Sequence, residues 1–260
     1  MLKQKISIHD KGETILAYLS RSDLEAIGAR VIRAYKKLPE VAGRPFEKVN
    51  SDLLVETLLG LRIDYRHLSP EGDRLGLTAF CEIGVEVFSK DPRPDDELYY
   101  MLDGSTILIE EDLIQEGANV GRRNYTISHE GCHHILKMLF PGDYGAQGSR
   151  HAIHYCCCNR RHNHDWEEWQ VETLAGIILM PAECVSVCMD HFGLGTRIRL
   201  LNRVFASDNY RRFEEMAAFM GVSKTALSIR LTQLGKIARN DFGDPYALVR
   251  IEKDEEDQDL

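Results

Sequence analysis

The chain contains 260 residues, of which 43% are hydrophobic and 28% charged, enough to bury a sizeable core in one or two globular domains. Its formal net charge of -9 at pH 7 argues against broad affinity for nucleic acid, which requires clustered lysine and arginine. The N-terminus has no apolar signal-peptide region, and no run approaches about 18 apolar residues. We therefore expect a cytoplasmic protein without membrane contact.

The first half of the chain predicts two helices followed by a small sheet. Apolar residues recur at helical spacing over residues 24 to 35, where Ser22 and Asp23 are placed to cap the helix, and again over residues 46 to 61. The period then shortens in four runs that contain β-branched residues and are bounded by Gly, Pro and Asp, which predicts three to five strands. These runs are RIDYRHL (62 to 68), LTAF (77 to 80), GVEVFS (84 to 89) and STILIEE (105 to 111).

The second half of the chain is mainly helical, so the predicted fold class is α+β. Proline and glycine residues mark the ends of its elements. The expected elements are a helix at about 120 to 139 that ends at Pro141 and Gly142, an irregular segment from 141 to 165, a helix at about 166 to 179 that closes at Pro181, and two or three further helices between 182 and 236.

A metal-binding pattern lies in the first of these helices, in the stretch YTISHEGCHHIL (125 to 136). Residues four apart on a helix lie about 6 Å apart along its axis and on one face, so His129 and His133 can direct their imidazoles at one metal ion. Together with Glu130 they form the HExxH pattern of zinc peptidases, in which the glutamate accepts a proton from a metal-activated water. The alternative is a helix with a core histidine and a solvated glutamate, and the metal interpretation requires a third ligand.

A third ligand is available in the stretch DWEEWQVETLAGIILMP (165 to 181). Glu168 and Glu172 lie four residues apart and share one face of the predicted helix. A thermolysin-like site takes one carboxylate from a second helix as a ligand, and a further acceptor holds a ligating imidazole in its correct tautomer. Glu168 and Glu172 can fill these two roles. Without HExxH upstream, both would be interpreted as solvated charges on an amphipathic helix.

At three places the sequence resembles the ImmA/IrrE metallopeptidases, a family of the HExxH, thermolysin-like gluzincin type. GRRNYTISHEGCHHIL (121 to 136) is similar to the family's arginine-rich lead into HExxH, and EWQVETLAGIILMP (168 to 181) is similar to its glutamate helix. MAAFMGVSKTALSIRLTQLG (216 to 235) resembles the helical segment that follows the catalytic core. The likeness covers roughly residues 24 to 240. Relatives usually carry Asp or Asn at the position of Glu172.

The resemblance implies a zincin-like core in which a small mixed sheet packs on the HExxH helix and the glutamate helix. It implies one zinc ion per chain held by His129, His133 and Glu168, with Glu130 as the general base. It also implies a zinc endopeptidase with a narrow choice of protein substrate, which in this family is typically a helix-turn-helix transcriptional repressor whose cleavage switches on genes. The expected organisation is an N-terminal extension (1 to 20), a metallopeptidase domain (21 to 192), a C-terminal helical segment (193 to 240) and an acidic, disordered tail (241 to 260).

Several further residues have less certain roles. His134 lies about 100° round the helix from His133, so we expect a partly buried, hydrogen-bonded histidine, and Cys132 is expected to be a small helix residue. Seven cysteines in a chain of this length, without a signal peptide, predict reduced thiols. The oxyanion of a peptidase transition state needs a donor, and the candidates are Tyr125, Tyr144, His151, His154 and Tyr155. A second metal site or a thiol redox switch could be built from His151, His154, Cys156, Cys158, His162 and His164, but their spacing is irregular.

Residues 216 to 235 have the spacing of a helix-turn-helix, with Ala217, Gly221, Val222 and Ser223 around its turn. The second helix carries Lys224, Arg230 and Gln233, which could contact DNA, although position 230 is usually apolar in this motif. We therefore favour a packing or substrate-recognition element. The alternative function is a non-catalytic regulatory or DNA-binding protein on a zincin scaffold.

Overall fold

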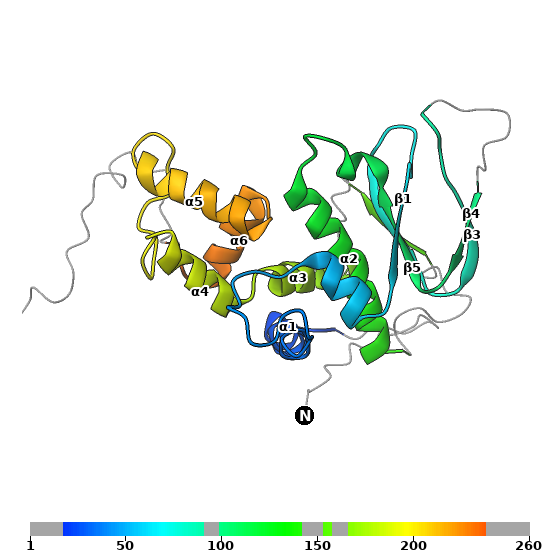
Figure 1. The fold of residues 1–260 in the computed structure, drawn as a ribbon, viewed down its shortest axis with the longest axis horizontal. Coiled ribbons are helices and arrows are strands. Elements are labelled where there is room, and N and C mark those ends of the chain that lie inside the picture. The colour runs from blue at the N-terminus through cyan, green and yellow to red at the C-terminus, as the bar shows by residue number, and fades with distance from the viewer. Residues whose placement is uncertain (1–17, 91–98, 142–152, 158–165, 238–260) are drawn as a thin grey trace, which may run out of the picture.

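The computed structural model describes residues 18 to 90, 99 to 141, 153 to 157 and 166 to 237, and the fold is α+β, as predicted (Figure 1). The segments predicted as an N-terminal extension and an acidic tail lie almost entirely outside the described residues. Helix α2 lies on one side of the sheet, and the hairpin of β3 and β4 lies on the other (Figure 1). The elements are α1 (Arg21–Tyr35), η1 (Leu53–Leu58), β1 (Arg62–Arg66), β2 (Arg74–Ala79), β3 (Glu82–Glu86), β4 (Tyr99–Asp103), β5 (Thr106–Glu110), η2 (Glu111–Ile114), α2 (Val120–Leu139), β6 (Ile153–Cys157), α3 (Trp166–Leu179), α4 (Ala182–His191), α5 (Ser207–Met220) and α6 (Lys224–Gln233).

The sheet is mixed, with strand order β1-β5-β2-β6. β1 is parallel to β5, while β2 is antiparallel to both of its neighbours. Strand β5 is buried along its whole length, because Ile107 and Ile109 pack on the α2 side and Leu108 packs toward the hairpin. A sheet covered on both faces explains why this strand is almost uniformly apolar.

Two strands were missed by the sequence prediction. β4 pairs with β3 as a hairpin, and β6 lies inside the stretch from 141 to 165 that was predicted to be irregular. The segment of β4, YYMLD, has three exposed positions, including Tyr99 and Met101, each 68% exposed. Its strand character therefore comes from pairing with β3 rather than from burial.

The first predicted helix is confirmed, but its cap is different. Ser20, not Ser22, caps α1: its side chain accepts a hydrogen bond from the Asp23 backbone N–H, and the Asp23 carboxylate accepts one from the Ser20 backbone N–H. This reciprocal pair is a capping box, which satisfies two backbone donors at the start of a helix. Gly28 then allows α1 to approach α3 closely, since a Cβ at this position would lie 2.5 Å from Ile177 Cγ2.

The second predicted helix, residues 46 to 61, is shorter than expected. Helical structure begins at residue 51, and Leu53–Leu58 has π-helical geometry. The Asn50 side chain accepts a hydrogen bond from the Leu53 backbone N–H at 3.1 Å, which fixes the start. The spacing of apolar residues alone did not distinguish the non-helical residues 46 to 50 from the helix that follows them.

Three helices, α4, α5 and α6, follow α3, as predicted for residues 182 to 236. Gly221, with φ of 65°, ends α5 in the left-handed conformation, and Ser223 caps α6, so residues 216 to 235 do form two helices joined by a tight turn. Their apolar faces pack with α4 and the end of α3 in one buried cluster. Within the described residues no single helix is long and apolar enough to cross a membrane, and α3 and α4, bent by 45°, reach that length and hydropathy only when combined.

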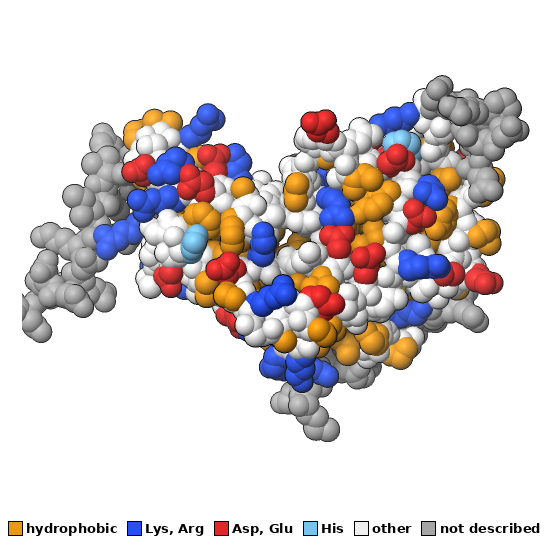
Figure 2. Space-filling view, viewed as in Figure 1, with side chains coloured by type: hydrophobic (Ala, Val, Ile, Leu, Met, Phe, Trp, Pro, Cys, Tyr) orange, Lys and Arg blue, Asp and Glu red, His pale blue; other side chains and the backbone are white. Residues whose placement is uncertain are grey.

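Charged side chains of both signs are interspersed over the face drawn in Figure 2, including the part formed by α4 and α5. On α5, for example, Arg211 pairs with Glu215, and Glu214 pairs with Lys224 of α6. This face therefore offers no continuous basic patch of the kind that binds a phosphate backbone.

Candidate metal centre

Helix α2 carries the two histidines of the HExxH pattern and is positioned by contacts on both sides. The Asn119 side chain caps it by accepting from the Arg122 backbone N–H at 3.1 Å. Gly131, inside the motif, allows η1 to pack against the helix, since a Cβ there would lie 2.9 Å from Val55 Cγ2. Ile127 and Leu136 anchor the helix in two apolar clusters. The motif therefore lies on a rigid, buried element.

The side chains of His129, His133 and Glu168 converge on one point. The Nε2 atoms of the two histidines are 3.3 Å apart, and the Glu168 carboxylate oxygens lie 3.3 Å from His129 Nε2 and 3.5 Å from His133 Nε2. Both imidazoles are almost completely buried, and the Glu168 side chain is 14% exposed. The structure thus brings together three residues from two helices, as the sequence predicted, in a group able to hold a metal ion.

The separations fit tetrahedral zinc. Zinc binds imidazole nitrogen and carboxylate oxygen at about 2.0 to 2.2 Å, and two ligands of a regular tetrahedron at that radius lie roughly 3.3 to 3.6 Å apart. The separation of the two Nε2 atoms falls within this range, and so does the distance from each Nε2 to one Glu168 oxygen, which is Oε2 for His129 and Oε1 for His133. Two imidazoles and one carboxylate are also the ligand set of thermolysin-like catalytic sites, which leave the fourth position for water or substrate.

Glu130 is completely buried, and within the described chain neither of its carboxylate oxygens has a hydrogen-bond partner. Burial, and next the nearby Glu168 carboxylate, raise the pKa of Glu130 well above its usual value. Its side chain lies against Gly76 of β2 and Thr126 of α2, because a Cβ added at Gly76 would collide with Glu130 Oε1. A desolvated carboxyl beside a group of metal ligands is equipped to exchange protons.

Glu172 lies one turn beyond Glu168 on α3 and is exposed to solvent. Its predicted role, to accept a hydrogen bond from a ligating imidazole, stays a prediction. Among the candidates for an oxyanion donor, the side chain of Tyr125 is described. It lies one turn before His129, with the two ring centroids 6.2 Å apart. The structure does not describe the side chains of Tyr144, His151, His154 and Tyr155, nor those of the residues considered for a second metal site.

The neighbours of the motif have structural roles. His134 is half-buried, and its Nε2 lies 2.7 Å from Thr78 Oγ1, which confirms the prediction of a hydrogen-bonded histidine outside the ligand group. Cys132 is fully buried, and burial raises the pKa of its thiol, so it is not a reactive group. Four cysteines whose side chains the structure describes form no disulfide: Cys81, Cys132, Cys184 and Cys188.

A second group of metal-ligand types, missed in the sequence, lies where β5 meets η2. His67 Nδ1 lies 2.7 Å from Glu110 Oε1, and Asp112 is close to both. However, Glu110 also accepts the Leu68 backbone N–H at 2.8 Å, and Asp112 pairs with Lys90. Since these contacts already use the oxygens that a cation would need, the group stabilises the start of η2.

Scans of the sequence against models of known families and against curated proteins find no match. The assignment of a function therefore depends on the geometry of the site and on the motifs that the chain carries.

Proposed function

We propose that the protein is a zinc-dependent endopeptidase with a zincin-like core, formed by α2 and α3 against the mixed sheet. The observation that carries the proposal is the convergence of His129, His133 and Glu168 at tetrahedral spacing beside a buried, unpartnered Glu130. A site that needed only a structural metal would have no use for this desolvated carboxyl. The substrate class we propose, a helix-turn-helix repressor cleaved in the cytoplasm, rests on the family resemblance.

Zinc held by these three residues would polarise the scissile carbonyl and acidify the attacking water. Glu130 accepts a proton from that water and delivers it to the leaving amide nitrogen, so that one side chain acts as base and then as acid. Its burial excludes bulk water from this proton transfer, and its backbone lies on the same rigid helix as the two histidines. Fixed distances between base and ligands follow from that arrangement.

The test is zinc content and peptidase activity for wild type, Glu168→Ala and Glu130→Gln, with Glu183→Ala as the control for loss of a glutamate elsewhere. Glu183 is exposed on α4 and pairs with Lys36, away from the ligand group. We expect one zinc per chain in wild type, Glu130→Gln and the control, and none in Glu168→Ala. Glu130→Gln should lose cleavage while it retains zinc. A wild-type protein without zinc under reducing, metal-replete conditions would refute the proposal.

The alternative, a DNA-binding protein that uses α5 and α6, has less support. Arg230, which the sequence offered as a DNA contact, is buried, and its Nε donates to the Met180 carbonyl oxygen at 2.9 Å. Lys224 pairs with Glu214. A gel shift with steep salt dependence would favour the alternative, because release of counterions from phosphates makes binding salt-sensitive.

A further inference from the structure

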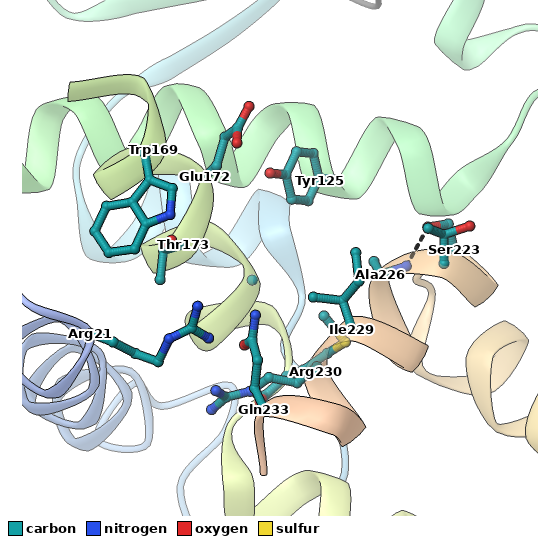
Figure 3. Close-up of a pocket in the computed structure, with 13 residues that line it drawn as sticks. Arg21, Tyr125, Trp169, Glu172, Thr173, Ser223, Ala226, Ile229, Arg230 and Gln233 are labelled. Carbon is teal, nitrogen blue, oxygen red and sulfur yellow. Dashed lines mark hydrogen bonds between the residues drawn. The ribbon is translucent and has the colours of Figure 1, made fainter. Parts of the chain in front are cut away.

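A cavity of about 380 Å³ opens next to the ligand group, between α2, α3, α6 and the start of α1 (Figure 3). We call it the α6 pocket. Its volume lies within the range of small-ligand and side-chain sites, about 300 to 1,000 Å³. Residues from all four helices line it, among them Arg21, Tyr125, Trp169, Glu172, Ile229 and Gln233.

The lining of the α6 pocket includes residues one helical turn from the ligand group on both α2 and α3. Tyr125 lies four residues before His129 on α2, and Glu172 lies four residues after Glu168 on α3. The two side chains point toward one another at the edge of the pocket (Figure 3). One helical turn corresponds to about 5.4 Å, and an extended peptide advances about 3.3 Å per residue. A substrate whose scissile bond lies at the ligand group would therefore reach the edge of the pocket with a side chain about two residues away, and its interior with the next one.

The wall formed by α6 combines apolar and polar side chains, with Ala226 and Ile229 beside Thr225 and Gln233. Ile229 is 53% exposed and lines the cavity together with Trp169 of α3 (Figure 3). Because water gains little from contact with these two side chains, burial of a large apolar side chain between them is favourable.

This wall is held firmly in place. A Cβ on Gly121 would lie 2.6 Å from Ser223 N, so the backbone at the start of α6 packs directly on α2. Asn124 donates to the Gly221 carbonyl oxygen at 2.9 Å. Arg230, a nearly buried residue of the lining, binds the Met180 carbonyl oxygen and the Glu25 carboxylate. The pocket is therefore preformed, which reduces the entropic cost of binding.

Arg21 supplies charge at the opposite side. It is the first residue of α1, and its guanidinium extends into the pocket toward the Gln233 amide (Figure 3). Among the contacts of the described residues, no ion pair involves Arg21. Glu172, the acidic residue of the lining, points away from it toward Tyr125 (Figure 3). A guanidinium next to an amide is a good partner for a carboxylate, which it can bind through two hydrogen bonds.

We propose that the α6 pocket is a specificity pocket for the polypeptide substrate. It accepts a large apolar side chain two or three residues from the scissile bond, and Arg21 binds an Asp or Glu carboxylate next to that side chain. The location of the scissile bond rests on the proposed endopeptidase function, while the selection of an apolar and acidic segment rests on the pocket itself. The HTH-like segment thus serves substrate recognition.

The experiment uses zinc-loaded Glu130→Gln protein, immobilised and exposed to a random decapeptide library, with the retained peptides sequenced. The same selection is repeated in Glu130→Gln proteins that also carry Arg21→Glu or Ile229→Trp. The matched controls carry Arg33→Glu, the same charge reversal on α1, or Val204→Trp, the same bulk at another exposed apolar residue. A glutamate in the first turn of α1 is compatible with the helix dipole, so Arg21→Glu should fold.

We expect retained peptides to combine a large apolar residue with an adjacent Asp or Glu. Arg21→Glu should lower the enrichment of acidic residues about tenfold or more, as expected for loss of a charge-assisted contact, and favour Lys and Arg instead. Ile229→Trp should shift the apolar preference to smaller side chains. If no peptides are enriched, or if the same peptides are enriched by both variants as by the parent protein, the proposed role of the α6 pocket in substrate selection is refuted. Enriched peptides that zinc-loaded wild type never cleaves would instead contradict the endopeptidase function and leave the pocket as a peptide-binding site.

Discussion

Gly76 on β2 provides a test of how closely the position of Glu130 is controlled. A Cβ added at Gly76 would overlap Glu130 Oε1, and would lie 2.7 Å from Thr126 Cγ2 and 3.0 Å from Glu130 Cδ. The backbone of β2 cannot easily shift away from Glu130, because Gly76 is paired with Ile109 of β5 on one side and with Cys156 of β6 on the other. In Gly76→Ala, we therefore expect the Glu130 carboxylate to move by about 1 Å, the distance needed to restore ordinary van der Waals contact.

A displacement of about 1 Å in a reacting group can lower a rate about 100-fold, and overpacking of a core costs about 1 to 3 kcal/mol. The three heavy atoms nearest the new methyl group belong to Glu130 and Thr126 and not to His129, His133 or Glu168. Gly76→Ala should therefore retain one zinc per chain, lose about 1 to 3 kcal/mol of unfolding free energy and cleave about 100-fold more slowly.

The assay combines zinc analysis, urea unfolding and cleavage rates of a peptide selected with the α6 pocket. Gly84→Ala is the control, since Gly84 also lies in a strand but is exposed, and its Cβ would meet only the flexible Met101 side chain at 3.2 Å from Sδ. A Gly76→Ala protein that binds zinc and cleaves as fast as wild type would refute the proposed role of the Glu130 position.

Three further predictions concern the helices around the site. Gly121→Ala should push the start of α6 away from α2, with a loss of about 1 to 3 kcal/mol in urea unfolding and weaker peptide selection at unchanged zinc content. Arg230→Leu removes a buried hydrogen bond and ion pair and should cost about 2 kcal/mol in the same assay, whereas loss of the exposed pair in Lys224→Ala should have a much smaller effect on unfolding. Because burial raises the pKa of Cys184 to about 12, almost none of it is thiolate at pH 8, so native-state alkylation followed by mass spectrometry should modify the partly exposed Cys81 and leave Cys184 unmodified.

The ligand group was within reach of sequence reasoning because its information is local. His129 and His133 are one helical turn apart, and the largely apolar stretch between Trp166 and Pro181 predicts the helix that carries Glu168. Helix boundaries marked by proline were also predictable, as the agreement at α2 and α3 shows.

The features that sequence reasoning missed depend on contacts between distant segments. In the sequence, Ser20 and Ser22 are equally suitable as helix caps. Which of them caps α1 depends on the backbone conformation of the residues that precede the helix. The importance of Gly76 appears only when β2 lies under α2, and the α6 pocket exists only when four helices meet. Arg230 was unusual in the sequence, but its partner Glu25 is 205 residues away. Position 230 is apolar in most helix-turn-helix motifs, and this could have indicated that Arg230 is buried.

The pairing of Arg230 with Glu25 also has a consequence for the order in which parts of the protein can fold. The helices that carry His129, His133 and Glu168 end at residue 179, so they can form their contacts while the rest of the chain is still being synthesised. The α6 pocket needs α6, the last described helix, and the contact between Arg230 and Glu25, which are 205 residues apart in the sequence. Because closing so long a loop is entropically costly, we expect this contact to form late in folding. During synthesis, the ligand group is therefore assembled before the surface proposed to select its substrate.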